Sequence, residues 1–103
     1  MKIAKVIWLD AFVEKLAVKH QVTTQEAEEV LLTSPHILWV EKGRIKGEHV
    51  YAAYGQTEAG RLLIVFFIYK GRGSVLPISG RDRTTSERRL FHEQNKAHRS
   101  YSG

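Results

Sequence analysis

The sequence predicts an α+β domain, in which a small antiparallel sheet combines an N-terminal strand with a meander and packs against two N-terminal helices and one C-terminal helix. Three observations lead to this class. Short β-branched and aromatic runs alternate with glycine turns between residues 36 and 81, two helix starts precede them, and a third follows. At 103 residues the chain suffices for one modest core. We expect a single domain over residues 1–97 and a frayed tail at 98–103.

The N-terminal strand and the first helix follow directly from the residue pattern. The β-branched stretch over residues 5–9 predicts the strand. Apolar residues then recur at helical spacing over residues 11–20, which predicts an amphipathic helix. Asp10 stands just before this helix, where an aspartate is a favoured N-cap.

Two further helices are predicted from capping boxes, in which a hydroxyl side chain and a glutamate three residues later satisfy each other's backbone N–H groups. Thr23 and Glu26 form the first box, and their helix ends where Ser34-Pro35 interrupts it. Thr84 and Glu87 form the second box. That box predicts a C-terminal helix from about residue 85 toward residue 97.

The middle of the chain predicts four strands joined by turns. The stretch Leu62–Tyr69 is apolar at nearly every position, so we expect a central strand with both faces covered. Pro77 cannot donate a ladder hydrogen bond, so its strand lies at an edge, is bulged or ends there. The glycine turns 57–60 and 71–73 predict tight hairpins. The expected strands are 36–41, 49–56, 61–70 and 74–81.

The charge of the chain is unevenly distributed. Residues 1–60 carry seven Lys/Arg and eight Asp/Glu, whereas residues 61–103 carry nine Lys/Arg and three Asp/Glu. A basic C-terminal part favours a polyanionic or acidic partner over a merely soluble basic surface. We expect no membrane partner because no apolar run approaches the length of a membrane span, and there is no secretory signal pattern. Absence of cysteine fits a reducing compartment, and we expect the protein in the cytoplasm.

Several kinds of site find no support in the sequence. The five histidines form no pair at helical i, i+4 spacing, and no Cys/His cluster exists, so we expect no metal. The turn Gly71–Ser74 lacks the spacing of a phosphate-binding loop. The serines lack a nucleophile motif. We therefore expect neither a cofactor nor covalent catalysis.

The arginines are the strongest chemical signal. RNA cleavage without a metal needs a base for the 2′-hydroxyl, a cation for the phosphate and an acid for the leaving oxygen, and arginine suits the second task. Arg61 begins one strand and Arg81 ends the next. Antiparallel pairing would therefore place both at the same end of the sheet, where the start of the last helix also favours a phosphate.

The other candidate residues each have two interpretations. Glu87 is a helix cap or ion-pair partner, or else a catalytic carboxylate. His20 complements the dipole of the first helix, or else acts on RNA. Arg88 and Arg89 form a solvated face or a surface that docks a protein partner. Trp8 is a core residue or stacks on a base. The candidate RNA contacts are Lys19, Arg72, Arg83 and Trp8.

Three stretches together resemble the BrnT family of toxins from bacterial type II toxin–antitoxin pairs. The first is "VIWLDAFVEKLAVKHQVTTQEAEEVL", with a tryptophan, a Lys-His pair and a V-[ST]-x-x-E-A helix start. The second is "YAAYGQTEAGRLLIVFFIY", with G-x-T-x-x-G-R-L-L-x-V. The third is "ISGRDRTTSERRLF", similar to I-S-A-R-x-x-T-x-x-E-R-x-x-Y. The order and spacing of the three stretches carry the resemblance, which runs from about Val6 to Phe91.

The resemblance implies a RelE-like fold and a ribonuclease that halts translation by cleaving RNA without a metal. It also implies a cognate antitoxin of the ribbon-helix-helix type, and contact with operator DNA through that antitoxin. By position in the motifs, it implies functional roles for Trp8, Lys19, His20, Arg61, Arg81 and Glu87.

The chain departs from the family pattern at several positions. Gln21 stands where many members have glycine after the Lys-His pair, and Gly80 replaces the alanine of the S-A-R motif. Leu76 and Pro77 occupy a region where many members carry an arginine. Two functions therefore stay open. One is an antitoxin-controlled ribonuclease, and the other is a catalytically weak or inactive module of the same fold that binds nucleic acid or a partner.

Overall fold

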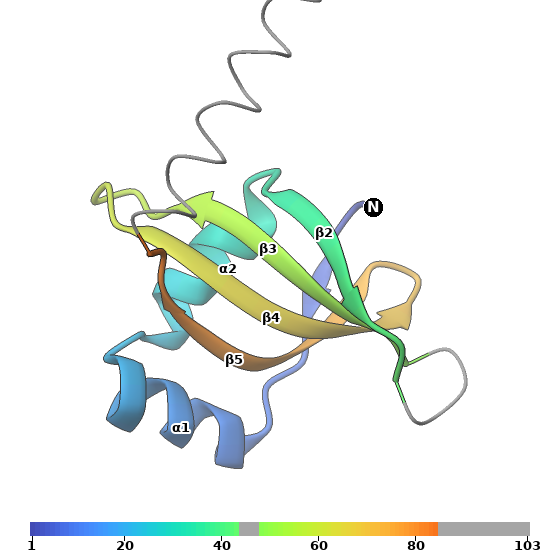
Figure 1. Ribbon diagram of the computed structural model, residues 1–103, viewed down its shortest axis with the longest axis horizontal. Coiled ribbons are helices and arrows are strands. Elements are labelled where there is room, and N and C mark those ends of the chain that lie inside the picture. Colours follow the sequence, from blue (N-terminus) through green and yellow to red (C-terminus); the bar gives the residue numbers. More distant parts are fainter. Residues whose placement is uncertain (44–47, 85–103) are drawn as a thin grey trace, which may run out of the picture.

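A computed structural model describes residues 1–43 and 48–84 of the chain. In this part a five-stranded sheet packs against two helices (Figure 1). The predicted C-terminal helix and the tail at 98–103 lie outside the described residues. The elements are β1 (Lys5–Val6), α1 (Asp10–His20), α2 (Thr24–Leu32), β2 (His36–Glu41), β3 (Val50–Gln56), β4 (Leu62–Gly71) and β5 (Ser74–Asp82).

The predicted meander is confirmed. The strand order is β1-β5-β4-β3-β2, and each consecutive pair from β2 to β5 is antiparallel. Both tight turns contain glycine with positive φ, at Gly60 (94°) and at Gly71 and Gly73 (93° and 78°). A residue without a Cβ adopts these angles without strain, so the glycines set the two hairpins. Strand β4 is the middle strand, as predicted.

The expectation of a wholly antiparallel sheet is wrong, because β1 pairs with β5 in parallel. The glycine turns determine only the direction of strands that follow one another. No hairpin joins β1 to β5, so local turn chemistry leaves their relative direction open. The strand is also shorter than the predicted 5–9, and it pairs only with Ser74 and Val75.

Pro77 lies at a bulge inside β5, which is one of the three predicted alternatives. Phe67 of β4 pairs with Pro77, but its neighbour Phe66 pairs with Ser79, so Ile78 is an extra residue. A bulge tolerates a residue without an N–H donor. It also reverses which face of the sheet the following residues occupy. Up to Pro77 the odd-numbered residues of β5 face the helices, and beyond the bulge the even-numbered ones do.

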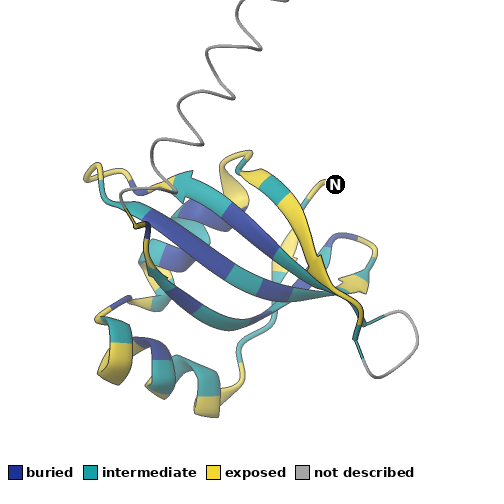
Figure 2. Ribbon diagram, in the orientation of Figure 1, coloured by how far each residue is buried: buried dark blue, intermediate teal, exposed yellow. Residues whose placement is uncertain are grey.

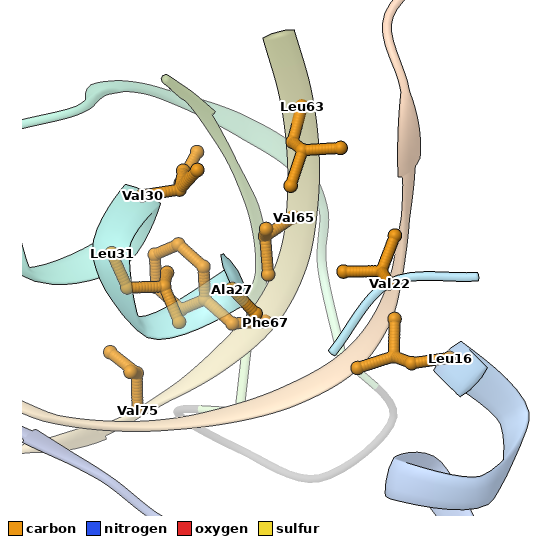
Figure 3. Close-up of a cluster of buried hydrophobic side chains, with 10 residues drawn as sticks. Leu16, Val22, Ala27, Val30, Leu31, Leu63, Val65, Phe67 and Val75 are labelled. Atoms are coloured by element: carbon orange, nitrogen blue, oxygen red, sulfur yellow. The ribbon is translucent and has the colours of Figure 1, made fainter. Parts of the chain in front are cut away.

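The core lies between the helices and one face of the sheet (Figure 3). Leu16 of α1 and Val30 of α2 are fully buried there against Leu63, Val65 and Phe67 of β4. Burying side chains of this size contributes about 1.5–3 kcal/mol each. The apolar pattern of β4 therefore supplies the surface that holds both helices.

We call the other side of the sheet the open face, because no helix of the described part of the chain covers it. The prediction that both faces of β4 are covered is confirmed for the side that packs against α1 and α2, and the predicted C-terminal helix lies outside the described residues. Ile64, on the open face, is only 1% exposed. Strand β2, at the sheet's edge, is mostly exposed (Figure 2), with Trp39 60% exposed.

The predicted capping box of α2 is present, with Thr23 as N-cap and Glu26 as its partner. Helix α1 differs from the prediction at its start. Leu9 is the N-cap residue, without a side-chain cap, and Asp10 lies in the first turn. A carboxylate there still interacts favourably with the positive end of the helix dipole. Helix α1 ends at Gln21, whose φ of 53° is left-handed.

Replacing Gln21 with glycine is expected to stabilise the protein by about 0.5–1 kcal/mol. Glycine adopts the left-handed conformation without steric cost, although it also makes the unfolded chain more flexible. The change is measured as the midpoint of thermal or urea unfolding. Glu14→Gly, in the exposed middle of α1, is the control and is expected to cost about 1 kcal/mol. Equal losses for both variants would contradict the assignment of Gln21 as a left-handed cap.

Candidate functional site

Arg61 lies beside the turn that joins β3 to β4, where the end of α1, the start of α2 and the end of β5 meet. Its Nε and Nη2 atoms donate to the two carboxylate oxygens of Asp82, at 2.8 and 2.9 Å. Its Nη1 atom also donates to the Glu26 carboxylate at 3.2 Å. The remaining donors bond the carbonyl oxygens of Gln21 at 2.8 Å and His20 at 3.1 Å. All five N–H donors of a guanidinium group are therefore used within the protein.

These contacts form a closed network of opposite charges at the covered side of the sheet. The paired Asp82 carboxylate raises the pKa of Arg61 beyond its usual range, with a further contribution from Glu26. The pKa of Glu26 is lowered, first because the backbone N–H of Thr23 donates to it and then because Arg61 does. Arg61 thus joins the end of α1, the start of α2 and the end of β5.

Arg81 lies at the same end of the sheet, as the sequence predicts, but on the open face. It pairs with Ile64 across β4 and β5, and its guanidinium lies over the ring of Phe66, 5.7 Å from the centroid. Asp82, the next residue, points to the other face and binds Arg61. The two arginines expected to share a site are therefore separated by the sheet.

Arg83 lies on the open face as well. Its guanidinium is 5.8 Å from the centroid of the Tyr54 ring. Its Nε atom donates to the carbonyl of Leu63 at 3.1 Å, and its Nη2 atom donates to the carbonyl of Gly55 at 2.5 Å. Only 4% of the residue is exposed. Arg83 therefore hydrogen-bonds the backbone at the end of β3 and at the start of β4. It also places a buried positive charge on the open face.

Two residues on the open face were not singled out by the sequence. His36 of β2 and Tyr54 of β3 pair directly across the strands, and their ring centroids are 6.4 Å apart. The loop between β2 and β3 is too long for its turn type to fix the register, so the sequence alone does not show that these residues face each other. We call His36, Tyr54, Phe66, Arg81 and Arg83 the open-face cluster.

The other predicted residues do not join this cluster. The Nε1 atom of Trp8 donates to the Glu28 carboxylate at 2.7 Å, and the residue packs against the core. Lys19 and His20 end α1, on the covered side. Arg72 lies in the turn after β4, which is ten residues long, so roughly 30 Å of strand separates it from Arg61. Glu87, Arg88 and Arg89 lie outside the described residues.

The described residues hold no group of three or more His, Cys, Asp or Glu side chains arranged to ligate a metal ion. None of the described helices combines the length and the apolar character needed to cross a membrane.

Comparison with known proteins defines the class to which this arrangement belongs. A family model described as "Ribonuclease toxin, BrnT, of type II toxin-antitoxin system" matches residues 8–87. The class is therefore that of ribonuclease toxins, which implies an RNA substrate and an antitoxin partner. More particularly, the chain belongs to the BrnT family, and the resemblance seen in the sequence is confirmed.

The fold agrees with this assignment. The crystal structure of the Brucella abortus ribonuclease toxin BrnT matches this chain with a TM-score of 0.58 and 19% sequence identity. The match covers 79% of this chain and 97% of that one. No curated protein matches the chain.

Proposed function

We propose that the protein cleaves RNA without a metal ion at the open-face cluster, and that a cognate antitoxin blocks this cleavage. One observation carries the proposal. In a chain of the ribonuclease toxin family, an imidazole, a phenol and a guanidinium lie in one row across the same face of the sheet, on strands β2, β3 and β5, with Ile64 of β4 between Tyr54 and Arg81. Those are the groups that RNA cleavage by proton transfer requires.

The reaction is an internal displacement at phosphorus. The 2′-oxygen bonds to the neighbouring phosphorus while the bond from phosphorus to the 5′-oxygen breaks. A base accepts the 2′-hydroxyl proton, and an acid gives a proton to the leaving oxygen. The products are a 2′,3′-cyclic phosphate and a 5′-hydroxyl. We assign the proton transfers to His36 with Tyr54, and the stabilisation of the phosphate charge to Arg81.

The aromatic rings support the role of the arginines. A cation–π contact uses the face of the guanidinium, whereas its N–H donors lie in the plane of the group. The face of the Arg81 guanidinium lies over Phe66 and its Nη1 atom donates to the Asp82 carbonyl at 3.2 Å, so a phosphate would approach Arg81 in the plane of the group. Arg83 adds positive potential, which is only weakly screened at a buried position. Aromatic rings between cationic groups also favour single-stranded RNA, whose bases stack on them.

The remaining predicted roles stay proposals. Arg61 contributes through the fold, because a phosphate would have to displace its carboxylates. His20 and Glu87 are kept as competing candidates for proton transfer, and Lys19, Trp8 and Arg72 as peripheral RNA contacts. Arg88 and Arg89 would meet the antitoxin. We further propose a RelE-like relationship, a ribbon-helix-helix antitoxin that carries the complex to operator DNA, and action in the cytoplasm.

A comparison of two histidines tests where cleavage occurs. With EDTA present, the purified protein is expected to cut RNA, and His36→Asn to cut it about 100-fold more slowly. His20→Asn is expected to retain most of the activity, since His20 ends α1 on the covered side. The measurement is the rate at which 2′,3′-cyclic phosphate ends appear.

Three outcomes would contradict parts of the proposal. A large loss for His20→Asn alone would move the site to the end of α1. Loss of wild-type cleavage in EDTA would show that a metal takes part. Binding of RNA that weakens steeply with salt, without any cleavage, would favour the alternative of an inactive binding module.

A further inference from the structure

Next to the open-face cluster, the described part of the chain forms a cavity of about 230 Å³. It lies between the start of β2, the end of β3 and the start of β4. Pockets that enclose drug-sized ligands measure roughly 300–1,000 Å³. This cavity is smaller, so it suits one planar ring system better than a whole nucleotide. Its walls include Ser34, Pro35, His36, Tyr54, Gln56 and Arg83.

The walls offer three kinds of contact. Pro35 and Leu62 are apolar, and the rings of His36 and Tyr54, tilted by 58°, provide aromatic surface. Ser34 and Gln56 provide hydrogen-bonding groups. This combination of aromatic faces, apolar contacts and a few polar groups is how proteins recognise an unpaired base.

The polar groups are held in position. Gln56 donates from Nε2 to the carbonyl of Gly60 at 3.2 Å, which orients its amide and leaves its oxygen as an acceptor. Ser34 has a left-handed φ of 53°. This conformation is common at the residue that follows a helix C-cap, and Ser34 follows the C-cap of α2, Thr33. Within the described residues, the hydroxyl of Ser34 makes no hydrogen bond to another side chain or to the backbone.

We infer that this cavity binds one unpaired nucleobase of the RNA, next to the phosphate held at Arg81. His36, Tyr54 and Arg83 line the cavity and also belong to the open-face cluster, so the two sites are continuous. The base in the cavity places its phosphate at the cluster, and Ser34 and Gln56 select the base by its hydrogen-bonding edge. The inference rests on the proposed ribonuclease function and adds a source of sequence preference to it.

Cleavage-site mapping on an RNA of random sequence tests the selection. Ser34→Ala and Gln56→Leu are expected to reduce the preference for one base beside the cut by roughly tenfold, because each removes a hydrogen-bonding group from the wall of the cavity. The loss should fall on KM for the preferred sequence, with kcat little changed. Gln25→Leu removes an exposed glutamine of α2 and is the matched control. An unaltered base preference in both cavity variants would overturn the inference.

A binding experiment keeps the inference separable from the proposed function. Four dinucleotides with 2′-O-methyl groups, which cannot be cleaved, are titrated while NMR follows the backbone amide of Ser34 and the side-chain amide of Gln56. One base is expected to shift these signals at lower concentration than the others. If no dinucleotide shifts them, the cavity does not bind a base, whether or not the protein cuts RNA. If they shift but RNA stays intact, the proposed cleavage fails and base binding stands.

Discussion

Replacing Arg81 with glutamine is expected to slow RNA cleavage by about 100- to 1,000-fold, which is the usual effect of removing one group that stabilises charge in a transition state. The expected loss is in kcat, because the phosphate gains negative charge as the 2′-oxygen attacks. The measurement is the single-turnover cleavage rate, with the unfolding midpoint as a check on the fold. Arg81 takes no part in the ion pairs of Arg61 with Asp82 and Glu26, although its Nη1 atom donates to the Asp82 carbonyl at 3.2 Å, so the midpoint should fall by only a few degrees.

Arg72→Gln is the matched control for this prediction, since it removes the same charge at the far end of β4. It is expected to weaken RNA binding only slightly and uniformly, as a distant phosphate contact does. In cells, expression of the wild-type chain without an antitoxin should arrest growth, and Arg81→Gln should relieve the arrest. Equal effects of the two substitutions would show that Arg81 contributes general charge and not a specific contact.

The local features of the fold could be predicted from the sequence because each depends on a few adjacent residues. The Thr23–Glu26 capping box and the two glycine turns are of this kind. The parallel pairing of β1 depends on residues far apart in the chain. The sequence holds no local signal for its direction.

The sequence predicted which end of the sheet holds Arg61 and Arg81, but not which face each occupies. The bulge in β5 explains why they lie on opposite faces. Arg61 and Arg81 do lie at one end of the sheet. Without the extra residue Ile78, side-chain alternation would turn Arg81 toward the helices, on the side where Arg61 binds Asp82. The bulge places it on the open face instead. Pro77 indicated that a bulge was one of several possibilities, but only the register shows which residue is extra.

Replacing Arg61 with alanine is expected to destabilise the protein by about 2–3 kcal/mol. The substitution leaves the Glu26 and Asp82 carboxylates without their cation and two carbonyl oxygens at the end of α1 without donors. Asp82 is 53% exposed and can recover solvent contacts, which keeps the cost below that of a fully buried pair. The unfolding midpoint should fall by roughly 10 °C or more.

Arg61→Lys separates charge from geometry. Lysine keeps the positive charge but cannot bond two carboxylates and two carbonyls at once, so an intermediate loss of stability is expected.

The loss of stability caused by Arg61→Ala should also become smaller in acid. The folded-state pKa of Glu26 is lowered, so its contribution is complete above its ordinary pKa of 4.5 and disappears as the pH falls through the lower value. If Arg61→Ala abolishes cleavage but unfolds like the wild type, Arg61 acts on RNA directly.

The parallel pairing of β1 has a consequence for synthesis on the ribosome. Strands β2 to β5 can pair in the order in which they are made, because each follows its neighbour. Lys5 and Val6 must wait for Ser74 and Val75, about 70 residues later. Such a long-range closure forms slowly. The first strand to be translated is therefore the last to join the sheet, so the nascent toxin completes its sheet only after most of the chain has emerged.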